Sequence, residues 1–317
     1  MGLSNSKPVS PSAMSQPPTN PVSEKTVLWW IDRQRFSPLY TVLPAEIRIL
    51  IFKFTLAKDV DLKNLYPFEA FYYRPGCAGP MRTDLSLLRT CRRVYREAKD
   101  LVWDPSTGNC EETFWWGGTI HRPKECRSYL HRNRSWEGTS STILTRPYTE
   151  SQWSMITSIH LYMEAHCCTT PVFTGFFARL AHLRPRVIRI TFRRTDWIGW
   201  EAVSGGLSLG TDVPWYHDDA QATGAIPNSV EAIILELETV EWRSDEVDDV
   251  ITMMFDHSSR CRWKREDGRY LVLDRQAGVK QWDWMGTSRP GYVGYKSQPL
   301  EFQTQYTVKV LMFTLRY

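Results

Sequence analysis

The sequence predicts an α/β protein in which an N-terminal helical region precedes strands that alternate with helices. Two amphipathic helical segments near the start of the chain and a later series of short apolar strands lead to this prediction. Because helices separate consecutive strands, we expect a largely parallel sheet, with an α+β arrangement as the alternative. The 317 residues are 42% hydrophobic and 23% charged, which is typical of a chain that buries a core.

Residues 1–25 form the first predicted region, a disordered tail. The tail is rich in proline and serine and offers little apolar surface to bury. Its start matches the pattern for N-myristoylation, with Gly2 as the acceptor and Ser6 at the required spacing, although this pair also arises by chance. One acyl chain holds a protein to a membrane only weakly, so membrane attachment is expected only if Gly2 is acylated.

Residues 43–57 predict the first helix. Pro44 suits the first turn, where its missing N–H would have no partner, and Glu46 lies near the positive end of the helix dipole. Apolar side chains recur at helical spacing and define one face, which consists of Ile47, Leu50, Ile51 and Phe54. We expect this face to pack against the second helix.

A loop at 59–83, rich in proline, glycine and aromatic residues, precedes the second predicted helix. Asp84 is expected to cap that helix, which extends to residue 103. Its predicted buried face consists of Leu87, Leu88, Cys91, Val94, Tyr95, Ala98, Leu101 and Val102. The opposite face carries Arg89, Arg92, Arg93, Arg96 and Lys99. A solvated surface explains these basic side chains better than a docking site does.

Short strands and helices alternate along residues 104–317. Strands are expected at 113–116, 155–163, 186–193, 230–242, 269–273, 280–284 and 306–314. Helices are expected at 172–183 and 244–257, the second with Ser244 as its cap and acidic residues in its first turn. A loop rich in glycine, aspartate and proline joins the strands at 186–193 and 230–242.

Two segments of the helical region resemble an F-box. The first helix matches at Leu43, Pro44, Glu46, Ile47, Ile51 and Phe52, and residues 87–95 resemble the later F-box element. The chain as a whole resembles a family of fungal F-box-like proteins with a degenerate leucine-rich-repeat-like α/β domain. The resemblance implies that helices within 26–103 dock on the Skp-type subunit of a cullin ubiquitin ligase. It also implies that the domain at 104–317 selects an unknown target protein.

The same resemblance assigns partner-binding or scaffold roles to individual residues. These are Leu43, Pro44, Glu46, Ile47, Ile51, Leu88, Cys91 and Tyr95. The loop at 59–83 is a departure from an ordinary F-box, in which the two matched elements lie closer together. If this insertion displaces the docking surface, ligase recruitment fails and only the helical fold persists.

No catalytic residue, cofactor site or metal site is predicted. The sequence contains no GxGxxG, no GxxxxGK[ST] and no CxxC motif. The densest group of metal-ligand residue types lies at 160–168, where a core strand followed by a turn is the better explanation. His217 beside Asp218 and Asp219 is better explained by a polar loop, because no nucleophile accompanies it.

Net charge and cysteine content indicate which classes of function and which cell compartments fit the chain. A formal net charge of +4, spread evenly, gives no support for nucleic-acid binding. Seven cysteines, with no apolar stretch long enough to span a bilayer, favour reduced thiols in the cytosol or nucleus. We therefore expect a protein-interaction module without a small-molecule substrate. The alternatives are a structural or regulatory interaction protein without a ligase, a weakly membrane-tethered signalling component, and a carbohydrate binder that uses Trp282 and Trp284.

Overall fold

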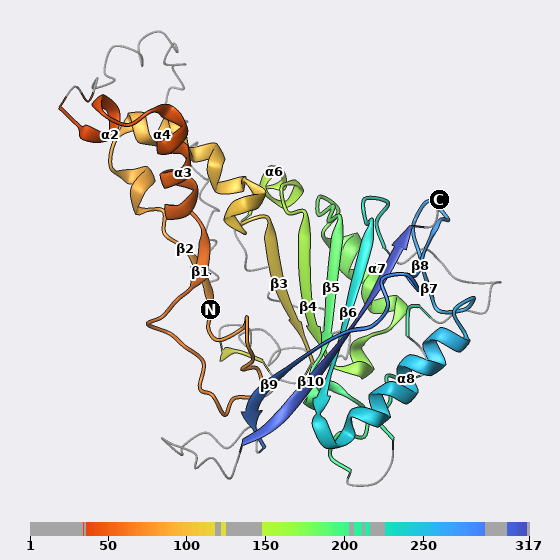
Figure 1. Ribbon diagram of the computed structural model, residues 1–317. Coiled ribbons are helices and arrows are strands. Elements are labelled where there is room, and N and C mark those ends of the chain that lie inside the picture. The colour runs from red at the N-terminus through yellow and green to blue at the C-terminus, as the bar shows by residue number, and fades with distance from the viewer. Residues whose placement is uncertain are drawn as a thin grey trace, which may run out of the picture.

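The computed structural model describes residues 34, 36–117, 122–124, 148–202, 206–210, 213–215, 226–288 and 303–315. Within these ranges a helical region adjoins a curled mixed sheet, so the predicted mixture of helices and strands is confirmed (Figure 1). The predicted tail with Gly2, and the loop residues His217, Asp218 and Asp219, lie outside the described residues.

The helical region combines α-helices with short 3₁₀ helices. Its elements are α2 (Pro38–Thr41), α3 (Ala45–Thr55), η1 (Ser86–Arg89), α4 (Arg92–Ala98), η2 (Lys99–Trp103) and η3 (Pro105–Thr107). The first predicted helix is α3, with Pro44 at its N-cap. Asp84 accepts a hydrogen bond from Ser86 N at 2.8 Å, but the N-cap of η1 is Leu85, one residue later than the expected cap.

The second predicted helix is not continuous, which corrects the expectation for residues 84–103. Cys91 has an extended backbone (φ −158°, ψ 162°) between η1 and α4. Its Sγ accepts a hydrogen bond from Val94 N at 3.4 Å and so caps α4. The apolar residues keep their helical spacing across this break, because the apolar side chains of η1, α4 and η2 all pack against α3.

The sheet has eight strands. They are β3 (Glu111–Trp116), β4 (Ser158–Met163), β5 (Val187–Phe192), β6 (Ala232–Val240), β7 (Arg262–Lys264), β8 (Tyr270–Leu273), β9 (Lys280–Thr287) and β10 (Gln303–Leu315). Their order is β3–β4–β5–β6–β10–β8–β7, and β9 pairs with β10. The expected parallel pairing is confirmed for β3 to β6, and the later strands add an antiparallel part.

Two helices cover one face of this sheet: α7 (Thr170–Arg179) and α8 (Ser244–Asp256). Every second residue of β4, β5 and β6 faces them, for example Leu161, Ile190 and Leu235, which are fully buried. The capping box of Thr149 and Gln152 starts α6 (Glu150–Ser154), which the sequence analysis did not predict. No helix of the described residues has both the length and the apolar character needed to cross a membrane.

The other face of the sheet is covered by the inserted loop. Its base is closed by the antiparallel pair β1 (Lys58–Val60) and β2 (Met81–Thr83). From there the loop runs toward β9 and away from α2, α3 and α4 (Figure 1). Its buried residues Ala70, Tyr72 and Cys77 pack on Trp115 of β3 and Tyr162 of β4. The insertion therefore joins the helical region to the sheet.

Candidate functional site

The two F-box-like helices contact each other through a small apolar cluster. Phe52 and Leu56 of α3 meet Val94 and Ala98 of α4, and all four side chains are buried. Around them pack half-buried residues of α2, η1 and η2, together with Cys91 at the start of α4. Leu88 and Cys91 are among these half-buried residues, so both pack against the contact between the helices.

The apolar face predicted for α3 points away from this contact. The exposed fractions are 43% for Ile47, 61% for Leu50, 39% for Ile51 and 87% for Phe54. The expectation that the apolar stripes of the two helices meet is therefore wrong for α3. Periodicity identifies residues that share a face, but it does not say whether that face meets the protein or the solvent.

The remaining predicted docking residues lie around this exposed face. Pro44 and Glu46 are exposed at the start of α3, and Leu43 is half-buried beside them. Tyr95 was expected in the buried face of the second helix but is 50% exposed. It lies one residue beyond Val94, so its side chain turns out of the contact between the helices.

An ionic and aromatic cluster fixes the helices to one another. Arg48 of α3 pairs with Glu97 of α4 at 3.1 Å and also donates to the backbone oxygen of Leu43 at 2.9 Å. Arg93 lies over the Tyr40 ring at 3.9 Å, so it is not simply a solvated basic residue. Burial, followed by Glu97, raises the pKa of Tyr40. The helix that carries the exposed apolar face is therefore fixed by contacts on its opposite side.

A second candidate site lies on the sheet, beneath the inserted loop. The side chains opposite the helix-covered face are Trp115, His160, Tyr162, Arg189, Thr191, Arg193, Glu236 and Glu238. The parallel register places Tyr162 beside Thr191 and Thr191 beside Glu236, so polar groups form a row across three strands. Alternation along each strand separates this polar face from the apolar core.

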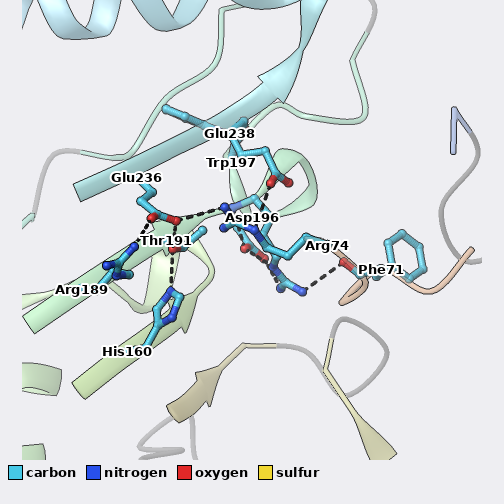
Figure 2. A network of polar contacts seen from close by, with 10 residues as sticks. Phe71, Arg74, His160, Arg189, Thr191, Asp196, Trp197, Glu236 and Glu238 are labelled. Atoms are coloured by element: carbon cyan, nitrogen blue, oxygen red, sulfur yellow. Dashed lines mark hydrogen bonds and ion pairs between the residues drawn. The ribbon is translucent and has the colours of Figure 1, made fainter. Parts of the chain in front are cut away.

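Glu236 is the centre of the hydrogen-bond network on this face (Figure 2). Its Oε1 lies 2.7 Å from Arg189 Nη1, and its Oε2 accepts a hydrogen bond from Thr191 Oγ1 at 2.8 Å. The loop residue Arg74 places Nη2 at 3.0 Å from the same Oε2. His160 Nε2 lies 2.8 Å from Thr191 Oγ1 and extends the network to β4.

Arg193 forms a second, deeply buried ion pair next to Glu238. It binds Asp196 through two hydrogen bonds of 2.7 Å, and both side chains are almost fully buried. Arg193 Nη1 also donates to the backbone oxygen of Phe71 in the loop at 3.1 Å. Trp197 Nε1 donates to the backbone oxygen of Glu238 at 2.8 Å. Both ends of the network therefore reach the inserted loop.

The charges on this face balance one another. Burial would lower the pKa of Arg74, but Glu238 and Glu236 outweigh it and hold that pKa above its usual range. Burial raises the pKa of Glu238, which Arg74 and Arg193 partly offset. Burial, followed by Arg74 and Arg189, holds the pKa of His160 well below its ordinary value, so its ring is neutral at neutral pH. Three arginines thus face three carboxylates, the third being Asp196.

The side chains on this face are paired with one another as arginines and carboxylates. In the described ranges, no three His, Cys, Asp or Glu side chains are grouped so that they could hold a metal ion. His160 is separated from the Cys167–Cys168 turn because it belongs to the polar face of β4, whereas Cys168 lies in the core on the other side.

One motif was missed in the sequence: residues 206–210 read GLSLG and so match the GxSxG pattern of serine hydrolases. The pattern requires a tight turn from a strand into a helix. Here Ser208 lies in an isolated antiparallel bridge with Ile198, and its Oγ accepts a hydrogen bond from Gly210 N at 3.0 Å. The described residues of this segment therefore do not have the strand–turn–helix geometry of that pattern.

The residues of the polar network were also missed. No sequence motif connects the residues of this network, so none of them was predicted. They are Arg74, Arg193, Asp196, Glu236 and Glu238. The alternation of polar and apolar residues at 186–193 and 230–242 was visible, and it could have identified a charged sheet face.

Trp282 and Trp284, the residues of the carbohydrate-binding alternative, both contact side chains of the inserted loop. The Arg74 guanidinium lies 5.2 Å from the Trp282 ring centre. Trp284 stacks on Tyr306 at 4.5 Å and meets Tyr73 of the loop at 6.4 Å. Both rings are half-buried, and each already contacts another side chain of the protein.

We compared the chain with known proteins in three ways. Family models, curated proteins and solved structures each gave no match to it.

Proposed function

We propose that this chain is a protein-interaction subunit that docks through the exposed face of α3. The partner is the Skp-type subunit of a cullin ubiquitin ligase, as the F-box resemblance implies, and the sheet region selects the target. The proposal rests on one observation: Ile47, Leu50, Ile51 and Phe54 form an apolar stripe that is exposed among the residues the structure describes. It places the protein in the cytosol or nucleus, where such ligases act.

The physical argument is the cost of leaving these side chains in water. Each large apolar side chain removed from water contributes about 1.5–3 kcal/mol, and four adjacent ones on a single helix are more than scattered exposure explains. Residues at helical spacing on one face suit a groove formed by another polypeptide. Because Arg48, Arg93 and Glu97 hold the helices together, binding needs little ordering of the face.

The inserted loop supports docking, because it extends away from this face. Phe54 remains 87% exposed with the loop in place, so the insertion does not form a cover over the stripe. The order of β4, α7 and β5 also fits a degenerate leucine-rich-repeat-like unit, with a strand, a helix and a parallel strand in succession. This finer assignment of the sheet region is part of the proposal.

The experiment uses the full chain and a purified Skp-type subunit in a direct binding titration. The double variant Leu50→Asp/Phe54→Asp changes two exposed side chains, so we expect a normal thermal unfolding transition and a loss of binding of at least about a hundredfold. Leu62→Asp is the matched control, because Leu62 is also exposed and also lies in the N-terminal region. Binding of the unaltered chain that the double variant does not weaken would overturn the docking site.

The second candidate function is a structural or regulatory interaction protein that recruits no ligase. Its support is the departure from an ordinary F-box, namely the long insertion between the two matched segments. A folded, unaltered chain that fails to bind the Skp-type subunit would favour this alternative. This second candidate includes weak attachment to a membrane through an acyl group on Gly2. The intact mass of the N-terminal segment from native cells shows whether that acyl group is present.

A further inference from the structure

The guanidinium of Arg74 occupies a cage on the polar face of the sheet (Figure 2). Its Nη2 lies 3.0 Å from Glu236 Oε2, and its Nε lies 3.5 Å from Glu238 Oε2. The ring centres of Trp282 and Tyr162 lie 5.2 and 5.9 Å from the guanidinium carbon. Two carboxylates with aromatic rings beside them form a site that suits the planar, delocalised cation of arginine better than the compact ammonium of lysine.

The segment that carries Arg74 is a largely self-contained unit. Backbone hydrogen bonds join Tyr66 N to Ala78 O, Tyr73 N to Ala70 O and Cys77 N to Arg74 O, all within the loop. The loop meets the sheet through side chains and through the Phe71 carbonyl, to which Arg193 donates. Its displacement would therefore break these side-chain contacts and the Phe71 hydrogen bond, but neither the β1–β2 pair at its base nor the pairing of the sheet strands.

The fit of Arg74 to its cage is incomplete. Among the described residues, its Nη1 has no hydrogen-bond partner, and neither does Glu238 Oε2, although both atoms are buried. A cavity of about 400 Å³ also remains between the loop and the sheet, lined by Cys77 and Pro80 on one side and by Trp115, His160 and Tyr162 on the other. A ligand that replaced Arg74 could give Glu238 Oε2 the hydrogen bond that it lacks, and residues beside that ligand could enter the cavity.

Without Arg74 the cage would carry a net negative charge. Glu236, Glu238 and Asp196 would then face only Arg189 and Arg193, because the His160 ring is neutral at neutral pH. Buried carboxylates left with too few partners destabilise the folded chain, so this face requires a cation from some source. The chain supplies one on a loop that is not part of the sheet.

We propose that this face of the sheet is a recognition site for an arginine-bearing segment of a partner polypeptide, and that the chain's own Arg74 occupies the site until the partner displaces it. The partner arginine takes the place of Arg74 between Glu236 and Glu238, and its neighbouring residues fill the space left by the loop. The site lies on the sheet and makes no use of the α3 face, so it does not depend on ligase docking.

The test uses the full-length Arg74→Ala variant and a synthetic peptide that copies residues 69–78, with serine in place of the cysteine. A second peptide carries alanine where the first carries arginine. We expect the variant to bind the arginine peptide at least about tenfold more tightly than the alanine peptide, because a charge-assisted contact is lost in the second. Adding Glu238→Gln to the variant should remove most of this preference.

The matched control is Arg82→Ala, which removes an exposed arginine at the base of the same loop and leaves the cage filled. This control should bind the arginine peptide as weakly as the unaltered chain does. If Arg74→Ala folds, as judged by its circular dichroism spectrum, and binds both peptides equally, the proposed recognition site is wrong.

Hydrogen exchange of the unaltered chain gives a second measurement if Arg74→Ala does not fold. Excess arginine peptide should accelerate exchange of the amides of Tyr66, Tyr73 and Cys77, because the loop is displaced, whereas β4 to β6 stay protected. The alanine peptide should have no such effect. Loop exchange that neither peptide changes would show that Arg74 is a fixed anchor, and would overturn the proposal without touching the ligase model.

Discussion

The helical region and the sheet region place apolar and charged side chains in opposite ways. On α3 the apolar residues Leu50 and Phe54 are exposed, although nothing in their chemistry favours contact with water. On the sheet Arg193 and Asp196 are almost fully buried, although charged groups lose hydration energy there. Each arrangement places side chains where their own chemistry alone would not favour them.

The difference shows that one sequence pattern can serve two purposes. In both regions, regular spacing separates apolar from polar side chains, with the helical period on α3 and the alternating period on β4 to β6. On the sheet the apolar side faces the core beneath α7 and α8, as expected. On α3 the larger apolar stripe faces outward, and only Phe52 and Leu56 supply the internal contact. To test this contrast, we compare residues of the same type, one of which is buried and the other exposed.

The largest expected effect comes from the two phenylalanines of α3, which lie two positions apart. Phe52→Ala should lower the free energy of unfolding by about 3–4 kcal/mol, because it leaves a cavity between α3 and α4 where Phe52 is fully buried. Phe54→Ala should leave it nearly unchanged, because that ring is exposed. Urea unfolding followed by circular dichroism measures both changes.

Equal losses for Phe52→Ala and Phe54→Ala would contradict the assigned orientation of α3. The comparison also separates stability from docking, since only Phe54→Ala should weaken the binding of a partner without unfolding the chain. A variant that unfolds cannot provide that information, so Phe54 is the useful position for binding measurements.

A smaller effect is expected from two arginine–carboxylate pairs with the same bidentate geometry. Arg193 and Asp196 are buried, whereas Arg186 and Glu231 form hydrogen bonds of 3.0 and 2.8 Å at the surface. Asp196→Asn should lower the free energy of unfolding by about 2–3 kcal/mol, because it removes the carboxylate that binds the buried Arg193 through two hydrogen bonds. Glu231→Gln should cause no measurable change, because water screens that pair.

Chemical denaturation of both variants in the same buffer provides the measurement. If the two substitutions had equal effects, burial would not be what distinguishes the sheet network from the surface. Added salt sharpens the result, because it should weaken the Arg186 pair and leave the Arg193 pair largely unaffected.

Much of the sheet region could be predicted from the sequence because its signals are local. Alternation identifies β4, β5 and β6 within a few residues of their ends, and helical spacing with acidic residues in the first turn identifies α8. The short elements β1, β2, β7 and α6 escaped prediction, because three to five residues carry too little pattern.

The candidate sites could be predicted only in part because their meaning depends on distant contacts. Ile47 and Ile51 were correctly placed on one face of a helix, but their exposure follows from where α4 packs. Arg74 pairs with Glu236 and Glu238, which lie on β6, far along the chain from the loop. Only the fold brings an inserted loop over a charged sheet face, so no local pattern could connect these residues.

The smallest expected effect concerns the acid response of the sheet network. The pKa of His160 lies well below its ordinary value in the folded chain, because of burial and of Arg74 and Arg189 nearby. Below about pH 6.5 the unfolded state therefore binds more protons at this residue than the folded state does. His160 should thus lower the free energy of unfolding by up to about 1.4 kcal/mol for each pH unit below that point.

His160→Gln should flatten this dependence, because an amide can still contact Thr191 but does not titrate. Unfolding in urea at about pH 7 and about pH 5 measures the slope for the variant and for the unaltered chain. Thr191→Val is the control, since it removes the hydrogen bond but keeps the titrating ring, so its stability should fall at both pH values while its slope remains. A slope that His160→Gln leaves unchanged would place the acid sensitivity outside the sheet network, and the buried charges would then respond to acid no differently from the rest of the chain.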